Sequence, residues 1–223
     1  MYWIAAFVSA AVIGVGGMFY LRYYLALKKA EISPREKKAA LPAAAAFFAA
    51  TAALMAAFAV PGDMGVFEFA RTVVVMHCLF YLAVIDFKVK LIPNQAVLAM
   101  LAAWALLIAA ELLCGADFVR LMPDLMLGGV IAGGLFFIGN LISRNGMGMG
   151  DVKLMAVTGL YLGMNRVMGL VFWALAAALV AGLALMAVKK AKMKTAIPLA
   201  PFFLAGSLIS NTLYIISGFA EVQ

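Results

Sequence analysis

The chain is poor in charged residues and in the residue types on which several kinds of active site depend. Only 12% of its residues are charged and 67% are hydrophobic, whereas soluble domains are about 25% charged. A soluble protein could not hide so much apolar surface. With one histidine, two cysteines and no C-x-x-C pair, little is left for a zinc site, a redox pair or a Ser–His catalytic set. We therefore expect an all-α, polytopic membrane protein that needs no metal and no cofactor.

The apolar residues form about eight runs, each close to the 17–25 residues needed to cross the hydrocarbon core. The predicted spans are 3–27, 42–61, 65–85, 95–113, 123–142, 152–165, 167–188 and 196–218. The sixth is short and need not cross fully. The first has no basic segment before it, so we expect a retained anchor rather than a cleaved signal peptide. We divide the bundle into a two-helix hairpin, 1–62, and a membrane domain, 63–223.

Positive charge is gathered on alternate connectors between the predicted spans. All lysines and arginines except Arg71, Arg120 and Arg166 lie at Arg22 or in the connectors 28–41, 86–94, 143–153 and 189–195. Basic connectors stay on the cytoplasmic side. We therefore expect a multi-pass protein of the cytoplasmic membrane with both termini outside. Lysines facing the anionic inner leaflet account for the net charge of +7 without a nucleic-acid partner.

Two aspartates lie at the cytoplasmic edge of this predicted topology. Asp86 ends the third span and Asp151 begins the sixth, and no other aspartate lies on that side. An acid at a helix end often only marks the membrane interface. Here, however, the approach to Asp151 is a glycine run, and non-helical backbone at membrane depth is tolerated only where protein covers it or a cavity lies beside it. Pro93 fits the first turn of the following helix, so a tight connector would hold Asp86 in place.

Chemistry can use two such acids if their helices are neighbours. Two close carboxyl groups cannot both ionise cheaply, so they share one proton. The ionised group can take a proton from water while the protonated group polarises a peptide carbonyl, and the roles then reverse to protonate the leaving amine. This pattern predicts aspartyl proteolysis without a covalent intermediate. We interpret His77, the single histidine, as a packing or hydrogen-bonding residue.

Three stretches of the sequence resemble one protein family. GMGMGDVK, at 146–153, is similar to the G-x-G-D-x-K signature of type IV prepilin peptidases, which are GxGD aspartyl membrane proteases. DFKVKLIPN, at 86–94, is similar to the first-aspartate motif of that family. KTAIPLAPFFLAGSLIS, at 194–210, resembles its late Pro-x-x-Pro-Phe motif. The three stretches stand in the order that the family shows.

The resemblance implies a catalytic dyad of Asp86 and Asp151 that acts at the cytoplasmic face. It implies prepilin or pseudopilin precursors as substrates, each a short basic leader followed by a hydrophobic helix. The residues expected to shape the site or bind substrate are Gly146, Gly148, Gly150, Lys153, Pro93, Asn94, Pro198 and Pro201. Lys153 also has a plain interpretation as an interface lysine, and the two late prolines as helix starters. The sequence does not indicate an oligomeric state.

The sequence departs from the larger members of the family in the connector 28–41. Those members carry a cytoplasmic domain there, often with two C-x-x-C pairs, that is associated with N-methylation of the new pilin terminus. Here the connector is short and contains no cysteine. We therefore expect a peptidase-only member without N-methyltransferase activity.

Two alternative functions stay open. One is a GxGD protease of the presenilin or signal-peptide-peptidase type, which would carry a Tyr-Asp pair and a Pro-Ala-Leu motif. This chain has Ile85-Asp86 and Ile197-Pro198-Leu199 instead. The other is a small proton-coupled transporter, which would place acids near the midplane and often show duplicated halves.

Overall fold

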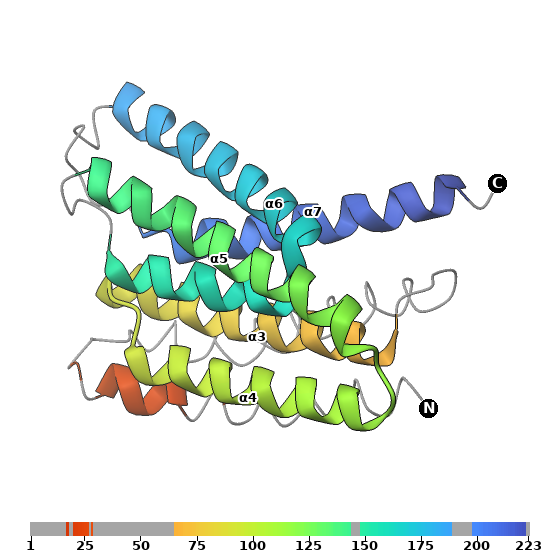
Figure 1. The fold of residues 1–223 in the computed structure, drawn as a ribbon. Helices are drawn as coiled ribbons and strands as arrows, with labels where there is room; N and C mark the ends of the chain where they lie inside the picture. The colour runs from red at the N-terminus through yellow and green to blue at the C-terminus, as the bar shows by residue number, and fades with distance from the viewer. Residues whose placement is uncertain are drawn as a thin grey trace.

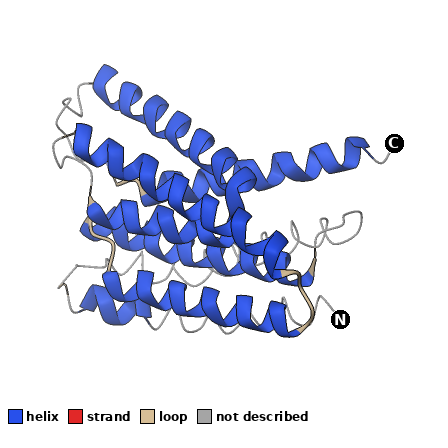
Figure 2. Ribbon diagram, in the orientation of Figure 1, coloured by secondary structure: helices blue, strands red, loops and turns tan. Residues whose placement is uncertain are grey.

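The computed structural model describes residues 17, 20–26, 28, 65–143, 148–188 and 198–221. Figure 1 shows the long helices of this part and a short helical segment at 20–26. The long helices are α3 (Val66–Val89), α4 (Asn94–Leu113), α5 (Phe118–Ile142), α6 (Met149–Ala187) and α7 (Ala200–Glu221). Within the described ranges there is no strand, as Figure 2 shows. The prediction of an all-α bundle is confirmed for these residues.

Four of the helices are long and apolar enough to cross a membrane. They are Phe67–Val89, Asn94–Leu113, Phe118–Ile142 and Met149–Ala187. The first three coincide with the predicted spans 65–85, 95–113 and 123–142. The predicted span 42–61 and the division at residue 62 fall outside the described residues, as does most of 3–27. The total of eight spans and the outside location of both termini therefore stay predictions.

α6 changes direction at Gly163, close to the predicted boundary between the sixth and seventh spans. Gly163 adopts φ 75° and ψ 175°, which separates a helix at 149–162 from a helix at 164–187. Glycine takes a positive φ at no steric cost. Asp124 of α5 caps the second half, because its Oδ1 accepts the N–H of Met164 at 3.1 Å. In Figure 1 the second half runs back toward the side from which the first half begins.

α5 and the first half of α6 pack with their backbones close together. A Cβ added at Gly128 would lie 2.6 Å from the carbonyl oxygen of Gly159, and one added at Gly159 would overlap the backbone of Gly128. Gly129 and Gly133 lie as closely against Leu160 and Ala156. Such small-residue faces allow close helix approach in membranes. Glycine here fixes the position of α6, and so of the residues at its N-terminus.

The interior of the bundle lies between α3, α6 and α7. Its fully buried side chains include Leu79, Ile85, Leu154, Met155 and Phe203. α4 and α5 present large apolar side chains on their outer faces, including Leu98, Val130 and Phe137. An apolar outer face on an apolar bundle fits a lipid environment better than water.

A polar network joins the helices at the end of the bundle where α3 begins. Arg166 of α6 donates to Glu68 Oε1 at 3.0 Å, to Thr72 Oγ1 at 2.9 Å and to Asn211 Oδ1 at 2.6 Å. Beside it, Arg71 forms an ion pair with Glu111 of α4, and both side chains are largely buried. The network fixes the second half of α6 against α3 and α7.

We expect opposite effects from adding a methyl group at two glycines of the α5–α6 pair. Gly159→Ala should destabilise the protein by about 2 kcal/mol or more, because the new Cβ overlaps the backbone of α5. Gly134→Ala should stabilise it by up to about 1 kcal/mol, because nothing lies within 4 Å of the added Cβ and alanine favours helix. Unfolding by SDS titrated into mild detergent measures both free energies. Equal losses in the two variants would contradict the packing described here.

We also expect the buried arginine network to matter far more than a surface ion pair. Arg166→Met should lower the free energy of unfolding by about 3 kcal/mol, because it leaves Glu68 and Asn211 without their donor. Arg120→Met is the matched control: that side chain is 90% exposed and lies 3.5 Å from Asp117, so its removal should change the free energy by less than about 1 kcal/mol. The same SDS titration compares them.

Candidate active site

Asp86 lies in the last turn of α3 and is buried, with 6% of its surface exposed. Its Oδ2 accepts the backbone N–H of Ala200 at 3.0 Å. Ala200 is the first residue of α7, so the carboxyl group of Asp86 lies at the positive end of a helix dipole. α3 ends just beyond it, at Val89. Its C-cap, Lys90, adopts a left-handed conformation and donates its N–H to the main-chain oxygen of Asp86.

The connector between α3 and α4 holds the second part of the site. Ile92 and Pro93 are buried, and Pro93 is the N-cap of α4. Pro93 needs no hydrogen-bond acceptor there because it has no N–H. Asn94 begins the helix, and its Oδ1 accepts a hydrogen bond from Nζ of Lys153 at 3.1 Å. Two residues predicted for the site, far apart in the sequence, thus meet directly.

Asp151 is the third residue of α6 and is half-buried. Its backbone N–H donates to the carbonyl oxygen of Gly148, the N-cap of the helix, at 3.1 Å. The Oδ1 of Asp151 is buried and has no hydrogen-bond partner among the described residues. A buried acceptor without a partner is costly, and at a site it marks a place where a ligand group or water can bind.

The glycines before Asp151 have no side chain and so allow neighbouring groups to pack closely against the backbone. A Cβ at Gly150 would lie 2.9 Å from Cβ of Ile92, and one at Gly148 would lie 3.2 Å from Oδ2 of Asp151. Gly150 therefore lets the start of α6 pack on the α3–α4 connector. Gly146, the first glycine of the predicted set, lies outside the described residues.

The structure brings the two predicted acids together. The charge of Asp86 acts on the carboxyl group of Asp151, which adds a repulsion when both are ionised. Three chain segments contribute to the site: the end of α3, the start of α6 and the start of α7. Two acids with one buried, unpartnered oxygen between helix N-termini can hold a water molecule and move its protons.

The two late prolines frame the residue that contacts Asp86. Pro198 precedes α7 and Pro201 is its second residue, in the first turn, where a missing N–H costs nothing. The N–H groups of Phe202 and Phe203 donate to the carbonyl oxygen of Leu199, which closes the first turn. The prolines thus start a helix whose first N–H donates to Asp86.

The sequence does not identify two residues that lie at or near the site, Ala200 and Asn140. Ala200 acts through its backbone N–H, which leaves no side-chain signal, although the prolines on each side mark its position. Asn140 is a buried amide near the end of α5 whose Nδ2 donates to Sδ of Met149 at 3.1 Å. A single amide in an apolar run could have drawn attention, because buried polar groups in membranes usually have a role.

The described part of the chain contains no residue set that suits the other kinds of catalytic site considered above. No group of three or more His, Cys, Asp or Glu side chains there could hold a metal ion. His77 is buried in α3, with Nδ1 2.6 Å from the carbonyl oxygen of Val73. It lies more than two helical turns from Asp86. These contacts agree with a packing or hydrogen-bonding role for the histidine.

Comparison with known proteins finds a family match for the part of the chain that includes the end of α3 and the start of α6. A model of the type IV leader peptidase family matches residues 73–183, which include both acids. The prepilin leader peptidase/N-methyltransferase of Bacillus subtilis (strain 168) is 30% identical over 146 residues, covering 64% of this chain and 55% of the relative. The chain thus spans about half the length of the curated relative it matches. No solved structure matches the chain.

A double-mutant cycle tests whether Lys153 and Asn94 join the two motifs as the structure shows. Lys153→Met and Asn94→Leu should each destabilise the protein slightly. The double variant should lose about 0.5–1 kcal/mol less than the two single losses added together, because the bond can be lost only once. Unfolding by SDS in mild detergent supplies the four free energies. Strictly additive losses would show that the bond does not form.

Proposed function

Because the chain belongs to the type IV leader peptidase family, we propose that it is a membrane aspartyl endopeptidase that cleaves the leader peptide of type IV prepilin-like or pseudopilin precursors. Asp86 and Asp151 would be its catalytic residues. The observation that carries the proposal is the convergence of these two acids at the junction of α3, α6 and α7. The family match supports neither of the two alternative functions, the proton-coupled transporter or the protease of the presenilin or signal-peptide-peptidase type.

The surroundings of the two acids suit a shared-proton mechanism. Ala200 holds one oxygen of Asp86 in a fixed place, whereas Asp151 has a buried oxygen without a hydrogen-bond partner among the described residues. With the Asp86 carboxyl group fixed and an oxygen of Asp151 available, the two acids can bind a water molecule and a peptide carbonyl group together. Holding the reacting groups in the correct geometry supplies much of the rate acceleration in enzymes. The translational and rotational entropy has then been lost before the chemical step begins.

The reaction then follows from one proton held between two carboxyl groups. The ionised acid takes a proton from water as its oxygen attacks the scissile carbonyl carbon, and the protonated acid gives its proton to the carbonyl oxygen. A tetrahedral diol results. The acid that gained a proton passes it to the leaving nitrogen while the other recovers a proton from the diol, and the C–N bond breaks. The products are a carboxylic acid and an amine, and the dyad again holds one proton.

The charge pattern supports a site at the cytoplasmic face of the inner membrane. The exposed lysines Lys88, Lys90 and Lys153 lie at the end of the bundle that carries the acids. Glu68 and Glu111 lie at the other end, where they pair with Arg166 and Arg71. Basic segments face the cytoplasm, so a substrate with a basic leader would present its cleavage site on that side.

The proposal covers peptidase activity alone. The name of the Bacillus subtilis relative also includes N-methyltransferase. In this chain the predicted connector 28–41 is short and has no cysteine, so it offers no counterpart of the cysteine-containing domain seen in larger family members. Mass spectrometry of the cleaved product would show whether a methyl group is added.

Substitution of either acid should abolish cleavage while the protein stays folded. Asp86→Asn and Asp151→Asn each remove a proton-transfer group, and the rate should fall by at least about 10²–10⁴-fold. The assay is incubation of purified protein with candidate prepilin peptides, followed by mass spectrometry of the products.

Asp117→Asn is the matched control for both variants. Asp117 caps α5 by accepting the N–H of Val119, and asparagine is an equally good N-cap. This variant should cleave at the wild-type rate. Activity retained by Asp86→Asn or Asp151→Asn would remove that residue from the dyad.

A further inference from the structure

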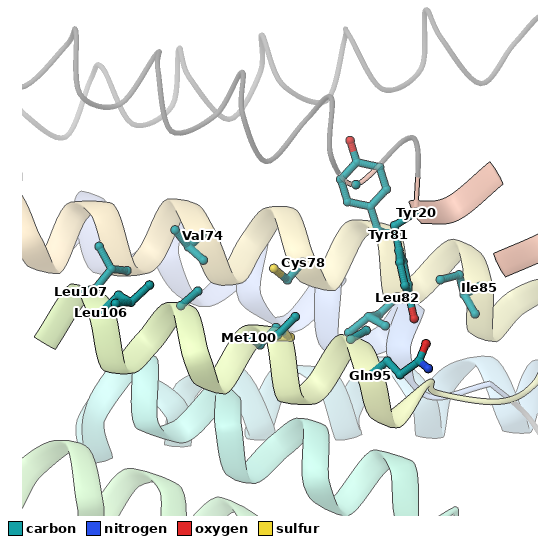
Figure 3. A pocket seen from close by; sticks show the side chains of 14 residues that line it. Tyr20, Val74, Cys78, Tyr81, Leu82, Ile85, Gln95, Met100, Leu106 and Leu107 are labelled. Carbon is teal, nitrogen blue, oxygen red and sulfur yellow. The ribbon is translucent and has the colours of Figure 1, made fainter. Parts of the chain in front are cut away.

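An apolar cavity of about 570 Å³ lies between α3 and α4, with Gly17 and Tyr20 on one wall. α3 lines it from Val74 to Ile85 and α4 from Gln95 to Leu107, as Figure 3 shows. The twelve helical residues from Val74 to Ile85 span about 16 Å, so the cavity follows much of the depth of a membrane leaflet. Its volume falls within the range of about 300–1,000 Å³ that is typical of ligand pockets.

One end of the cavity is lined by residues that are next in sequence to residues of the proposed active site. Ile85, at that end, immediately precedes Asp86 in α3. Gln95 immediately follows Asn94, the residue that accepts a hydrogen bond from Lys153. Figure 3 shows Ile85 and Gln95 at one end and Leu106 and Leu107 at the other. A substrate chain that leaves the dyad past Ile85 or Gln95 would therefore enter the cavity at that end.

The walls favour a peptide over a lipid acyl chain as the occupant. The α4 wall includes Ala96, Ala99 and Ala103, and small side chains let another helix approach closely.

We propose that this cavity binds the apolar segment that follows the scissile bond of the substrate, a peptide with a polar leader joined to a hydrophobic helix. The inference rests on the function proposed above. A helix about 10 Å wide and 16 Å long occupies about 1,300 Å³, more than the cavity holds. The cavity therefore takes the side chains of one helix face while the opposite face stays outside it.

A bulky substitution inside the cavity should weaken binding of substrates that have the apolar segment. The test uses two substrate peptides with the same leader and cleavage site. The apolar peptide continues with an apolar segment, and the polar peptide continues with a short polar segment. Ala103→Trp, in the cavity wall, should raise KM for the apolar peptide about tenfold and leave kcat unchanged. The polar peptide should be cut as by wild type. Ala102→Trp is the matched control, because Ala102 is exposed on α4 and does not line the cavity.

The two native cysteines provide a second measurement that does not depend on the tryptophan variants folding. Cys78 lines the cavity, whereas Cys114 is exposed beyond the end of α4. The Asp151→Asn variant keeps the substrate intact, and the apolar peptide carries one cysteine about six residues past its scissile bond. Oxidation with copper phenanthroline should then join the peptide to Cys78. Cys78→Ala should abolish the product and Cys114→Ala should leave it.

The outcomes separate the docking proposal from the proposed function. If wild type cuts both peptides with the same KM and no disulfide to Cys78 forms, cleavage stands and docking in this cavity is wrong. Equal effects of Ala103→Trp and Ala102→Trp would overturn the docking proposal too. So would a phospholipid that native mass spectrometry finds in wild type but not in Ala103→Trp, with cleavage unchanged. If no peptide is cut in a way that depends on both acids, the proposed function itself fails.

Discussion

The hydrogen bond from Ala200 N–H to Asp86 sets the arrangement on which the rest of the site depends. A carboxyl group buried in an apolar bundle without a donor would be strongly unfavourable. The start of α7 supplies that donor, so it must lie against the end of α3. Pro198 and Pro201 fix where α7 starts. One backbone bond therefore joins the first and the last of the three motifs, and the middle motif must meet them at the same point.

The middle motif reaches that point because glycine removes side chains along its path. Gly150 allows the start of α6 to lie on Ile92, and Gly159 allows the same helix to lie against the backbone of α5. Each glycine weakens a helix by up to about 1 kcal/mol relative to alanine. The close packing that they allow offsets this cost. At the N-terminus of α6 the packing also brings Asp151 close to Asp86, as the proposed function requires.

The sequence predicts the helices well and singles out two candidate acids, but it does not predict the residues with which they interact. Acids are rare in so apolar a chain, so their positions alone single out Asp86 and Asp151. The length and hydropathy of the apolar runs locate α3, α4 and α5 within a few residues. The bond from Ala200 leaves no trace in residue type, because any residue but proline has that N–H. Pairing across the bundle is equally hidden: Arg166 and Glu68 are far apart in the sequence and meet only through the turn at Gly163.

Both ends of the bundle bury charged groups, but they treat them differently. Where α3 begins, Arg166 and Arg71 pair with acids from neighbouring helices. Such pairs hold helices in register, and their charges are satisfied by one another. Where α3 ends, Asp86 and Asp151 lie close enough for their charges to interact, and one oxygen of Asp151 is buried with no hydrogen-bond partner among the described residues. No stability follows from that arrangement, since like charges repel. A fold that satisfies its charges at one end and leaves two acids close together at the other agrees with the catalytic role proposed for the second end.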